Sequence, residues 1–98
     1  MAIFCFDLDG VLCKTEFGNY EKSEPMKDRI ELVNKLYNNG DYIIIDTARG
    51  SLTRMNWLGL TRKQLEKWGL KYHELRVGGK PFANFYIDDY AINSKDFF

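Results

Sequence analysis

Acidic, hydroxyl and basic side chains recur in this 98-residue sequence beside short apolar runs. Asp7 and Asp9 follow the first run, Thr47 follows the second, Lys80 lies in a glycine-containing loop, and Asp88-Asp89 follows the last. Carboxylates gathered in one crevice repel one another unless a cation relieves them, and oxygen ligands without thiolate or imidazole favour Mg²⁺. A hydroxyl and an ammonium beside such a metal suit a phosphoryl group. The pattern therefore predicts metal-assisted phosphoryl chemistry.

The apolar runs that would hold these side chains have the length and composition of buried strands. We predict strands over residues 2–6, 43–45 and 85–87, and a weaker one over 74–77. Short continuous apolar runs are typical of strands buried on both faces of a parallel sheet. In open α/β sheets, ligands bind beyond the carboxyl ends of the strands, which is where the acidic residues stand.

Helical patterns occupy the stretches between the predicted strands. Pro25 suits a first helical position and Gly40 a C-terminal cap, with apolar residues at helical spacing between them. A second helix is predicted to begin with a capping box of Thr61 and Gln64 and to end at Gly69. The sequence thus predicts two helices that cover the sheet.

Two further segments carry weaker signals. Residues 51–58 are expected to hold another helical turn or two, and residues 11–24 a loop or small hairpin over the end of the first strand. Strands that alternate with helices predict an α/β fold with a parallel sheet flanked by helices. The length fits a single compact domain over residues 1–98.

Charge and composition restrict the function classes. Fourteen basic and fourteen acidic residues give a formal net charge of zero, whereas a protein that neutralises nucleic-acid phosphates normally has a basic excess. Cys5 and Cys13 lack a C-x-x-C spacing, and the single histidine, His73, is too few for a zinc site and is expected to be a surface or packing residue. With no signal-peptide core and no apolar run of roughly 20 residues, we expect a cytoplasmic protein without a membrane partner.

In order, the motifs resemble those of the haloacid-dehalogenase-like (HAD) hydrolase superfamily. Its first motif is an apolar strand followed by D-x-D-G, its second a strand ending in Thr or Ser, its third a Lys, and its fourth an acidic pair that closes a strand. The matching residues here are Asp7-Leu8-Asp9-Gly10, Thr47, Lys80 and Asp88-Asp89. The resemblance implies a Rossmann-like catalytic domain and a Mg²⁺-dependent phosphomonoester hydrolase.

The resemblance also implies a role for each match. Asp7 would be the nucleophile that attacks phosphorus and forms an aspartyl phosphate, and Asp9 would protonate the leaving alkoxide and then activate water. Mg²⁺ would be held by a carboxylate oxygen of Asp7, the backbone carbonyl of Asp9, and Asp88.

The remaining matches would contact the phosphate or support those that do. Thr47, Ala48 and Lys80 would bind the phosphoryl group, and Asp89 would orient Lys80 or a metal-bound water. Arg49 is an accessory candidate that would bind substrate or pair with an acidic residue, Asp46 or Asp89.

Asp46 departs from the superfamily pattern, in which an apolar or neutral residue precedes the Thr of the second motif. Because side chains alternate along a strand, Asp46 should point away from the face that Thr47 uses. We expect a structural role for it, such as capping the next helix or pairing with Arg49.

Length also predicts that the domain carries no cap. Larger members of the superfamily insert a cap domain that closes the site, but residues 10–47 and 47–80 have room only for loops, helical segments and a short strand.

The stretches 67–73, 79–81 and 87–93 resemble small bacterial or phage phosphatases of the capsule-biosynthesis type. An open site would accept a phosphorylated small molecule or a phosphorylated polymer end, and a second subunit of a homo-oligomer is an alternative way to close it.

Other functions fit part of the pattern. Response-regulator receiver domains combine an acidic cluster, a Thr and a Lys-Pro pair, but their acidic pair ends the first strand and their phosphoacceptor ends a middle strand. Here Thr47 follows the second strand and the acidic pair follows Lys80, an order that disfavours a receiver. A catalytically inactive phosphate-binding or signalling relative is disfavoured because every catalytic position is filled. A polynucleotide-end phosphatase stays an alternative within the enzyme class.

Some residues near the motifs have a structural and a functional interpretation. Trp57 and Trp68 could form a base-stacking platform, but they are expected in the core, because aromatic residues at helical spacing usually pack there. Phe17 and Tyr20, in the loop over the site, are candidates for substrate contact. Cys13 is expected to pack rather than to control redox state.

Overall fold

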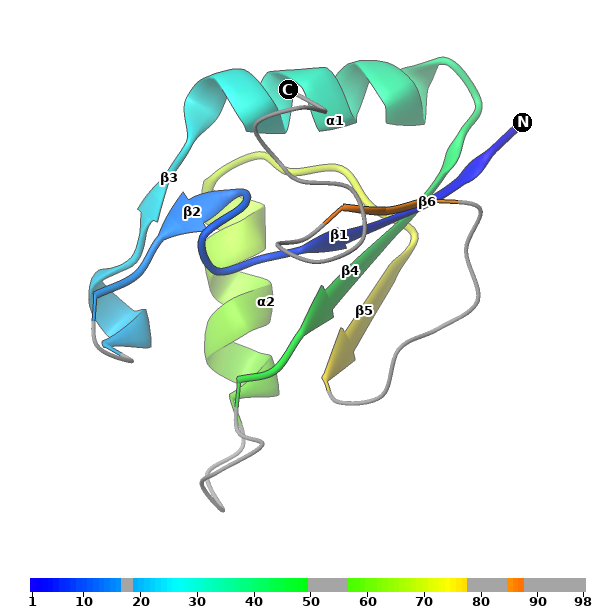
Figure 1. The fold of residues 1–98 in the computed structure, drawn as a ribbon. Helices are drawn as coiled ribbons and strands as arrows, with labels where there is room; N and C mark the ends of the chain where they lie inside the picture. The colour runs from blue at the N-terminus through cyan, green and yellow to red at the C-terminus, as the bar shows by residue number, and fades with distance from the viewer. Residues whose placement is uncertain (17–18, 50–56, 78–84, 88–98) are drawn as a thin grey trace.

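A parallel sheet organises the fold of the computed structural model (Figure 1), which describes residues 1–16, 19–49, 57–77 and 85–87. Its four strands are β1 (Ile3–Asp7), β4 (Tyr42–Thr47), β5 (Glu74–Val77) and β6 (Phe85–Ile87). They lie in the order β5-β4-β1-β6, and every pairing is parallel. All the strand predictions are confirmed, and the first two strands extend to the polar residues that follow their apolar runs.

The direction of travel across the sheet reverses beside β1. From β1 the chain crosses to β4 and then to β5, and it later returns to the other side of β1 as β6. At such a switch point the connections after neighbouring strands run in opposite directions and leave a crevice at the carboxyl edge. Asp7, the last residue of β1, stands at this point.

A short hairpin-like unit follows β1, as predicted for residues 11–24. It contains β2 (Cys13–Lys14) and β3 (Glu24–Pro25), which pair antiparallel, and the 3₁₀ turn η1 (Tyr20–Lys22) between them. The unit lies beside α2, beyond the carboxyl end of β1 (Figure 1).

Helix α1 (Lys27–Asn38) begins later than the sequence predicts. Pro25 is extended, because it pairs with Cys13 in the small antiparallel sheet, and the N–H of Met26 then donates to the carbonyl of Leu12 at 2.9 Å. The prediction that Pro25 occupies the first helical position is therefore wrong.

Helix α2 (Leu58–Lys67) begins earlier than the sequence predicts. Trp57 is at its N-cap, so Thr61 and Gln64 lie inside the helix and are buried there. The capping-box prediction is wrong, because the same spacing of three residues also places two side chains on one face of a helix. Of the segment predicted to hold a further helical turn, residues 51–56 lie outside the described residues.

Both helices end at the predicted glycines. Gly40 and Gly69 have φ angles of 95° and 70°, a left-handed conformation that glycine adopts without strain. After each glycine, the next N–H reaches back into the last turn: Asp41 donates to Leu36 and Leu70 to Leu65, both at 3.1 Å. These are the hydrogen bonds of a Schellman motif, which predicts a sharp stop.

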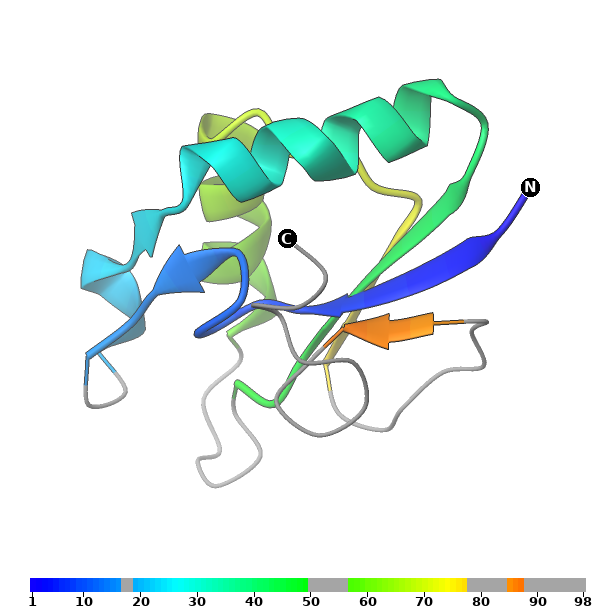
Figure 2. The ribbon, with the colours of Figure 1, turned by 45° about the horizontal axis from the view of Figure 1, so that its top comes forward.

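The two faces of the sheet differ in what covers them. Phe6, Ile43 and Ile45 join the main hydrophobic core, together with Val33 from α1 and Leu65 from α2. Both helices therefore cover the same face, as Figure 2 shows. Cys5 and Ile44 face the other way and form a small separate cluster.

The architecture confirms the predicted single small α/β domain of Rossmann-like type, with a parallel sheet and its helices. Within the described residues, the connection from β1 to β4 holds only the hairpin unit and α1. None of the described helices is long and apolar enough to cross a membrane.

Candidate functional site

The chain turns sharply after β1 and keeps two acidic residues at the carboxyl edge of the sheet. Asp7 ends the strand half-buried, and the N–H of Leu8 donates to its Oδ1 at 2.9 Å. The carbonyl of Leu8 then accepts the N–H groups of Val11, Leu12 and Cys13 at 2.9 to 3.3 Å. This bond pattern closes a tight loop around Asp9.

Gly10 makes that loop possible. Its φ of 83° lies in the left-handed region, where other residues are strained, and its N–H donates to the carbonyl of Cys13 at 2.8 Å. Among the described residues, the hydrogen bonds that close the loop use the carbonyls of Leu8 and Cys13 and not that of Asp9. Within the described residues, no backbone hydrogen bond of this loop competes with a ligand for the Asp9 carbonyl oxygen.

Asp7 and Thr47 reach the edge from adjacent strands. Asp7 is paired in register with Asp46, so these two residues share one face of the sheet. Thr47 follows on the other face, 2% exposed, and its Oγ1 accepts the N–H of Arg49 at 3.2 Å. The predicted opposite orientation of Asp46 and Thr47 along β4 is consistent with this alternation. Ala48 is exposed between Thr47 and Arg49.

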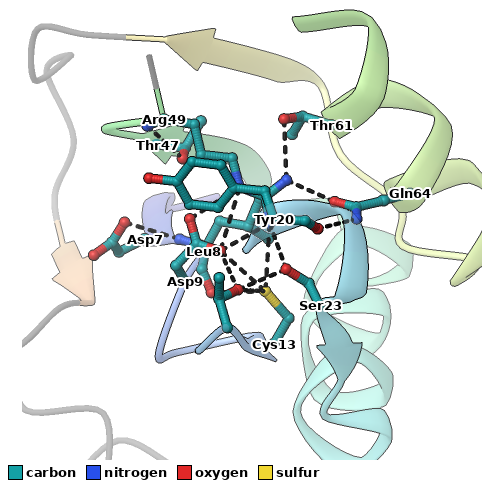
Figure 3. Close-up of polar contacts among 11 residues, drawn as sticks. Asp7, Leu8, Asp9, Cys13, Tyr20, Ser23, Thr47, Arg49, Thr61 and Gln64 are labelled. Carbon is teal, nitrogen blue, oxygen red and sulfur yellow. Dashed lines mark hydrogen bonds and ion pairs between the residues drawn. The ribbon is translucent and has the colours of Figure 1, made fainter. Parts of the chain in front are cut away.

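A buried arginine dominates the polar contacts of the site (Figure 3). The side chain of Arg49 is fully buried, and its Nε and Nη2 donate to the carboxylate of Asp9 at 2.9 and 2.8 Å. Its Nη1 donates to Thr61 at 3.2 Å and to Gln64 at 2.6 Å, both in α2. Nη2 also donates to the hydroxyl of Ser23 at 3.2 Å. Arg49 thus joins the β1 loop, the hairpin unit and α2.

These contacts correct the expectation for Arg49. A guanidinium has five N–H donors, and Asp9, Thr61, Gln64 and Ser23 engage all three of its nitrogens. The expected pairing of Arg49 with Asp46 is wrong, because the guanidinium is committed to Asp9. The alternative pairing with Asp89 concerns a residue outside the described part of the chain.

Asp9 receives several donors at once. Besides Arg49, the hydroxyl of Thr15 donates to its Oδ1 at 2.6 Å, and the thiol of Cys13 lies 3.5 Å from the same oxygen. Burial alone would raise the pKa of Asp9, but the hydrogen bonds from Arg49 and Thr15 and the charge of Arg49 outweigh it, and the pKa lies below its ordinary value. The site therefore favours the carboxylate form of Asp9.

Cys13 behaves as a packed residue, as predicted. It is fully buried, and burial raises the pKa of its thiol to about 11. A thiol with so high a pKa stays protonated at neutral pH and is a weak nucleophile. Its Sγ lies 3.8 Å from Nη2 of Arg49 and 3.5 Å from Oδ1 of Asp9.

Tyr20 covers the arginine from the hairpin unit. The guanidinium carbon of Arg49 lies 4.7 Å from the centre of the Tyr20 ring, and the amide nitrogen of Gln64 donates to the Tyr20 carbonyl at 2.6 Å. The Tyr20 ring also meets the edge of Trp57, with ring centres 5.0 Å apart. Tyr20 is half-buried, so the structure gives it a packing role beside the site.

Part of the predicted site lies outside the described residues. This applies to Lys80, Asp88 and Asp89, and to Phe17 in the hairpin unit. β5 and β6, which precede the first three of these, end at the same edge of the sheet as β1 because the sheet is parallel.

Two of the three predicted metal ligands lie within the described residues, and both offer oxygen atoms. Asp7 supplies carboxylate oxygens and Asp9 a carbonyl oxygen, which are hard ligands of the kind Mg²⁺ prefers. No group of three or more His, Cys, Asp or Glu side chains suited to a metal occurs within residues 1–16, 19–49, 57–77 and 85–87. The third predicted ligand, Asp88, is beyond that part of the chain.

Sequence reasoning missed four polar side chains around Arg49, namely Thr15, Ser23, Thr61 and Gln64. One signal was available in α2, where Thr61 and Gln64 stand beside Leu65 on the face that enters the core. A polar side chain at an apolar position has to find a hydrogen-bond partner.

Two cavities in the described part of the chain lie away from this edge. One of about 490 Å³ runs between α1 and the end of α2, beside Ile30, Lys67 and Trp68. The other, of about 290 Å³, lies on the hairpin unit between Lys14 and Lys22. Neither is lined by Asp7, Asp9 or Thr47.

Comparison with known proteins identifies a similar solved structure. No family model and no curated protein matches the chain. A crystal structure of a structural-genomics target from Vibrio cholerae is similar over 99% of this chain and 87% of its own, with 30% sequence identity and a TM-score of 0.76. The chain therefore belongs to the same family as that Vibrio cholerae protein and shares its fold.

Proposed function

We propose that this chain is a Mg²⁺-dependent phosphatase that hydrolyses a phosphomonoester through an aspartyl phosphate on Asp7. The main support is the position of Asp7, at the end of β1 and at the switch point of the sheet. Asp9 lies in the same loop and Thr47 ends the adjacent strand. The motif resemblance to the HAD superfamily adds independent support.

In the first step, an oxygen of the Asp7 carboxylate attacks phosphorus. A bond forms between that oxygen and phosphorus while the ester P–O bond breaks, and Asp9 delivers a proton to the leaving oxygen. The products of this step are the free alcohol and a phosphorylated Asp7.

In the second step, Asp9 takes a proton from water, whose oxygen attacks phosphorus. The bond to Asp7 breaks, inorganic phosphate leaves, and Asp9 regains the proton that it gave up. Over the cycle, one ester and one water become one alcohol and one phosphate.

The phosphoryl group needs positive charge and donors around it. In the proposed site, Asp7, the Asp9 carbonyl and Asp88 would hold Mg²⁺, which would supply positive charge to neutralise the phosphoryl oxygens. The Thr47 Oγ1 accepts from Arg49, so its own proton stays available to donate. Ala48 and Lys80 complete the set of proposed phosphate contacts.

The decisive experiment compares wild type with Asp7→Asn. Purified protein with Mg²⁺ is screened against sugar phosphates, nucleotides and phosphorylated oligonucleotides, and released phosphate is measured. The amide cannot attack phosphorus, yet its oxygen can still accept the Leu8 N–H, so the fold should persist. We expect turnover to fall by about 10³-fold or more.

Asp41→Asn is the matched control. Asp41 accepts the N–H of Ala2 at 3.0 Å through Oδ1, at the opposite edge of the sheet, and the amide oxygen can keep that bond. Its activity should equal that of wild type. If Asp7→Asn keeps activity within about tenfold of wild type, the covalent mechanism is wrong; release of phosphate from oligonucleotides alone would favour a polynucleotide-end phosphatase.

A further inference from the structure

The two oxygens of the Asp9 carboxylate have unequal surroundings (Figure 3). Oδ1 accepts from Nη2 of Arg49 at 2.8 Å and from the hydroxyl of Thr15 at 2.6 Å, with Nε of Arg49 at 3.3 Å and the Cys13 thiol at 3.5 Å. Oδ2 accepts only from Nε of Arg49, at 2.9 Å, among the described residues. Each carboxylate oxygen has two lone pairs, so Oδ1 is saturated and Oδ2 keeps capacity.

The guanidinium that makes this difference is itself held in place. Its remaining donors bind Thr61 and Gln64 in α2 and Ser23 beside β3, and the Tyr20 ring covers its face at 4.7 Å. If Arg49 followed a movement of the Asp9 carboxylate, it would lose its hydrogen bonds to Thr61, Gln64 and Ser23. Arg49, which follows β4, is therefore held in place by α2 and the hairpin unit. The Asp9 carboxylate is oriented by its bonds to this fixed guanidinium.

We propose that Arg49, assisted by Thr15, is a positioning residue that fixes the Asp9 carboxylate so that Oδ2 is the atom that exchanges protons. This inference rests on the proposed phosphatase function and assigns it an atom. The proton leaves Oδ2 for the ester oxygen as the P–O bond breaks, and a proton returns to Oδ2 from water as the Asp7–phosphorus bond breaks. Oδ1 stays hydrogen-bonded to Arg49 and Thr15 throughout.

The rates on two esters distinguish an Arg49–Asp9 pair that only stabilises the fold from one that positions Oδ2 for proton transfer. The ratio kcat/KM covers the steps up to formation of phospho-Asp7, in which Asp9 only protonates the leaving group. Phenyl phosphate needs that proton, whereas 2,4-dinitrophenyl phosphate has a stable leaving anion and does not. Misplacing Oδ2 should therefore slow the first ester selectively, while general damage to the fold should slow both equally.

The test measures kcat/KM for both esters with Mg²⁺ in Arg49→Lys. Lysine keeps the charge but cannot form the bidentate fork. We expect kcat/KM for phenyl phosphate to fall by about 10²-fold, because small misplacements of a proton-transfer group cost about that much, and kcat/KM for the dinitrophenyl ester to change by less than about threefold.

Arg29→Lys is the matched control. Nη1 of Arg29 donates to the Val11 carbonyl at 2.9 Å, so it also holds the loop after β1, whereas the side-chain donors to Asp9 within the described residues are Arg49, Thr15 and Cys13. Its ratio between the two esters should equal that of wild type.

Thr15→Val keeps the inference testable if Arg49→Lys does not fold. It removes one donor to Oδ1 and keeps the shape of the side chain, and we expect a selective loss of about tenfold on phenyl phosphate. If these variants lose equal activity on both esters while wild type hydrolyses both, Arg49 is only structural and the inference is wrong. If wild-type protein hydrolyses no phosphomonoester, the proposed function fails and the inference fails with it.

Discussion

The two edges of the sheet join distant segments by different physical means. At the carboxyl edge, Arg49 pairs with Asp9, 40 residues away, through buried charges and hydrogen bonds. At the amino edge, His73 stacks between Tyr37 and Tyr42, with ring centres 4.5 Å apart on each side. Burying charges carries a desolvation cost that stacking does not. This desolvation cost falls at the carboxyl edge, which is where we propose the chemistry.

His73 also completes the backbone hydrogen bonding of β4. Its Nδ1 accepts the N–H of Ile43 at 3.1 Å, and its own N–H donates to the Ile43 carbonyl at 2.9 Å. The imidazole thus takes the place of a strand carbonyl just before β5 begins at Glu74. His73 was predicted to be a surface or packing residue, and it is both: it is exposed and stacks on two tyrosine rings, so its role at this edge is structural.

Removal of the metal should reduce turnover more than any of the substitutions below, and it should act only at the carboxyl edge of the sheet. A chelator should abolish turnover, Mg²⁺ should restore it, and Ca²⁺ should substitute poorly. Mg²⁺ needs near-octahedral geometry at about 2.1 Å, whereas Ca²⁺ sits farther out and takes more ligands, which would engage the second oxygen of Asp7. Phosphate release is the measurement, and full activity in chelator would refute the metal assignment.

Asp9→Asn should give the next largest effect, because the amide can neither give nor take a proton. We expect a loss of about 10²–10⁴-fold in turnover. With acetyl phosphate, whose leaving group needs no proton, the variant should accumulate phospho-Asp7, seen as a mass increase, while wild type shows little. A wild-type protein that keeps its phosphoryl group for many minutes and hydrolyses no ester would instead be a signalling domain.

Arg49→Met should reveal what the buried pair contributes to stability. It leaves Thr61 and Gln64 without this donor and the Asp9 carboxylate with only Thr15 and Cys13 among the described residues. We expect a loss of about 3 kcal/mol, the lower limit for a broken buried pair, because Asp9 keeps some solvent contact. Urea denaturation measures it. Arg76→Met is the control, because Arg76 pairs with Glu74 at 3.5 Å on the surface. An equal loss of stability in the two variants would show that the buried Arg49–Asp9 pair contributes no more than an exposed ion pair.

His73→Phe should have the smallest effect and none on turnover. The phenyl ring keeps the stacking with Tyr37 and Tyr42 but cannot accept the Ile43 N–H, so we expect a destabilisation of about 1 kcal/mol. Comparing its urea midpoint and its kcat/KM with those of wild type checks both parts. A large drop in activity would contradict the separation of the two edges.

The sequence predicted those features that depend on neighbouring residues. The strands, the glycine stops at Gly40 and Gly69, and the gathering of Asp7, Asp9, Thr47 and Ala48 at one edge all follow from apolar runs, turn chemistry and parallel topology. Lys80, Asp88 and Asp89 lie outside the described residues, so their placement stays a prediction, and so does the phosphatase activity.

The features that the sequence did not predict depend on partners far along the chain. Nothing local marks Asp9 rather than Asp46 as the partner of Arg49, because the choice follows from how α2 and the hairpin unit pack. The capping-box error has the same origin. The three-residue spacing of Thr61 and Gln64 fits a helix start and a buried polar face equally well, and only Arg49 decides between them.

The place of β1 between β4 and β6 has a consequence during synthesis of the protein. β1 is made first, but its partner β6 begins at Phe85, so one edge of β1 has no strand to pair with until about 80 further residues have been translated. At roughly 5–20 residues per second, that delay lasts on the order of 4–16 s. During this interval that edge of β1 carries unpaired N–H and C=O groups of the kind that pair with other chains, and pairing with β6 then covers them.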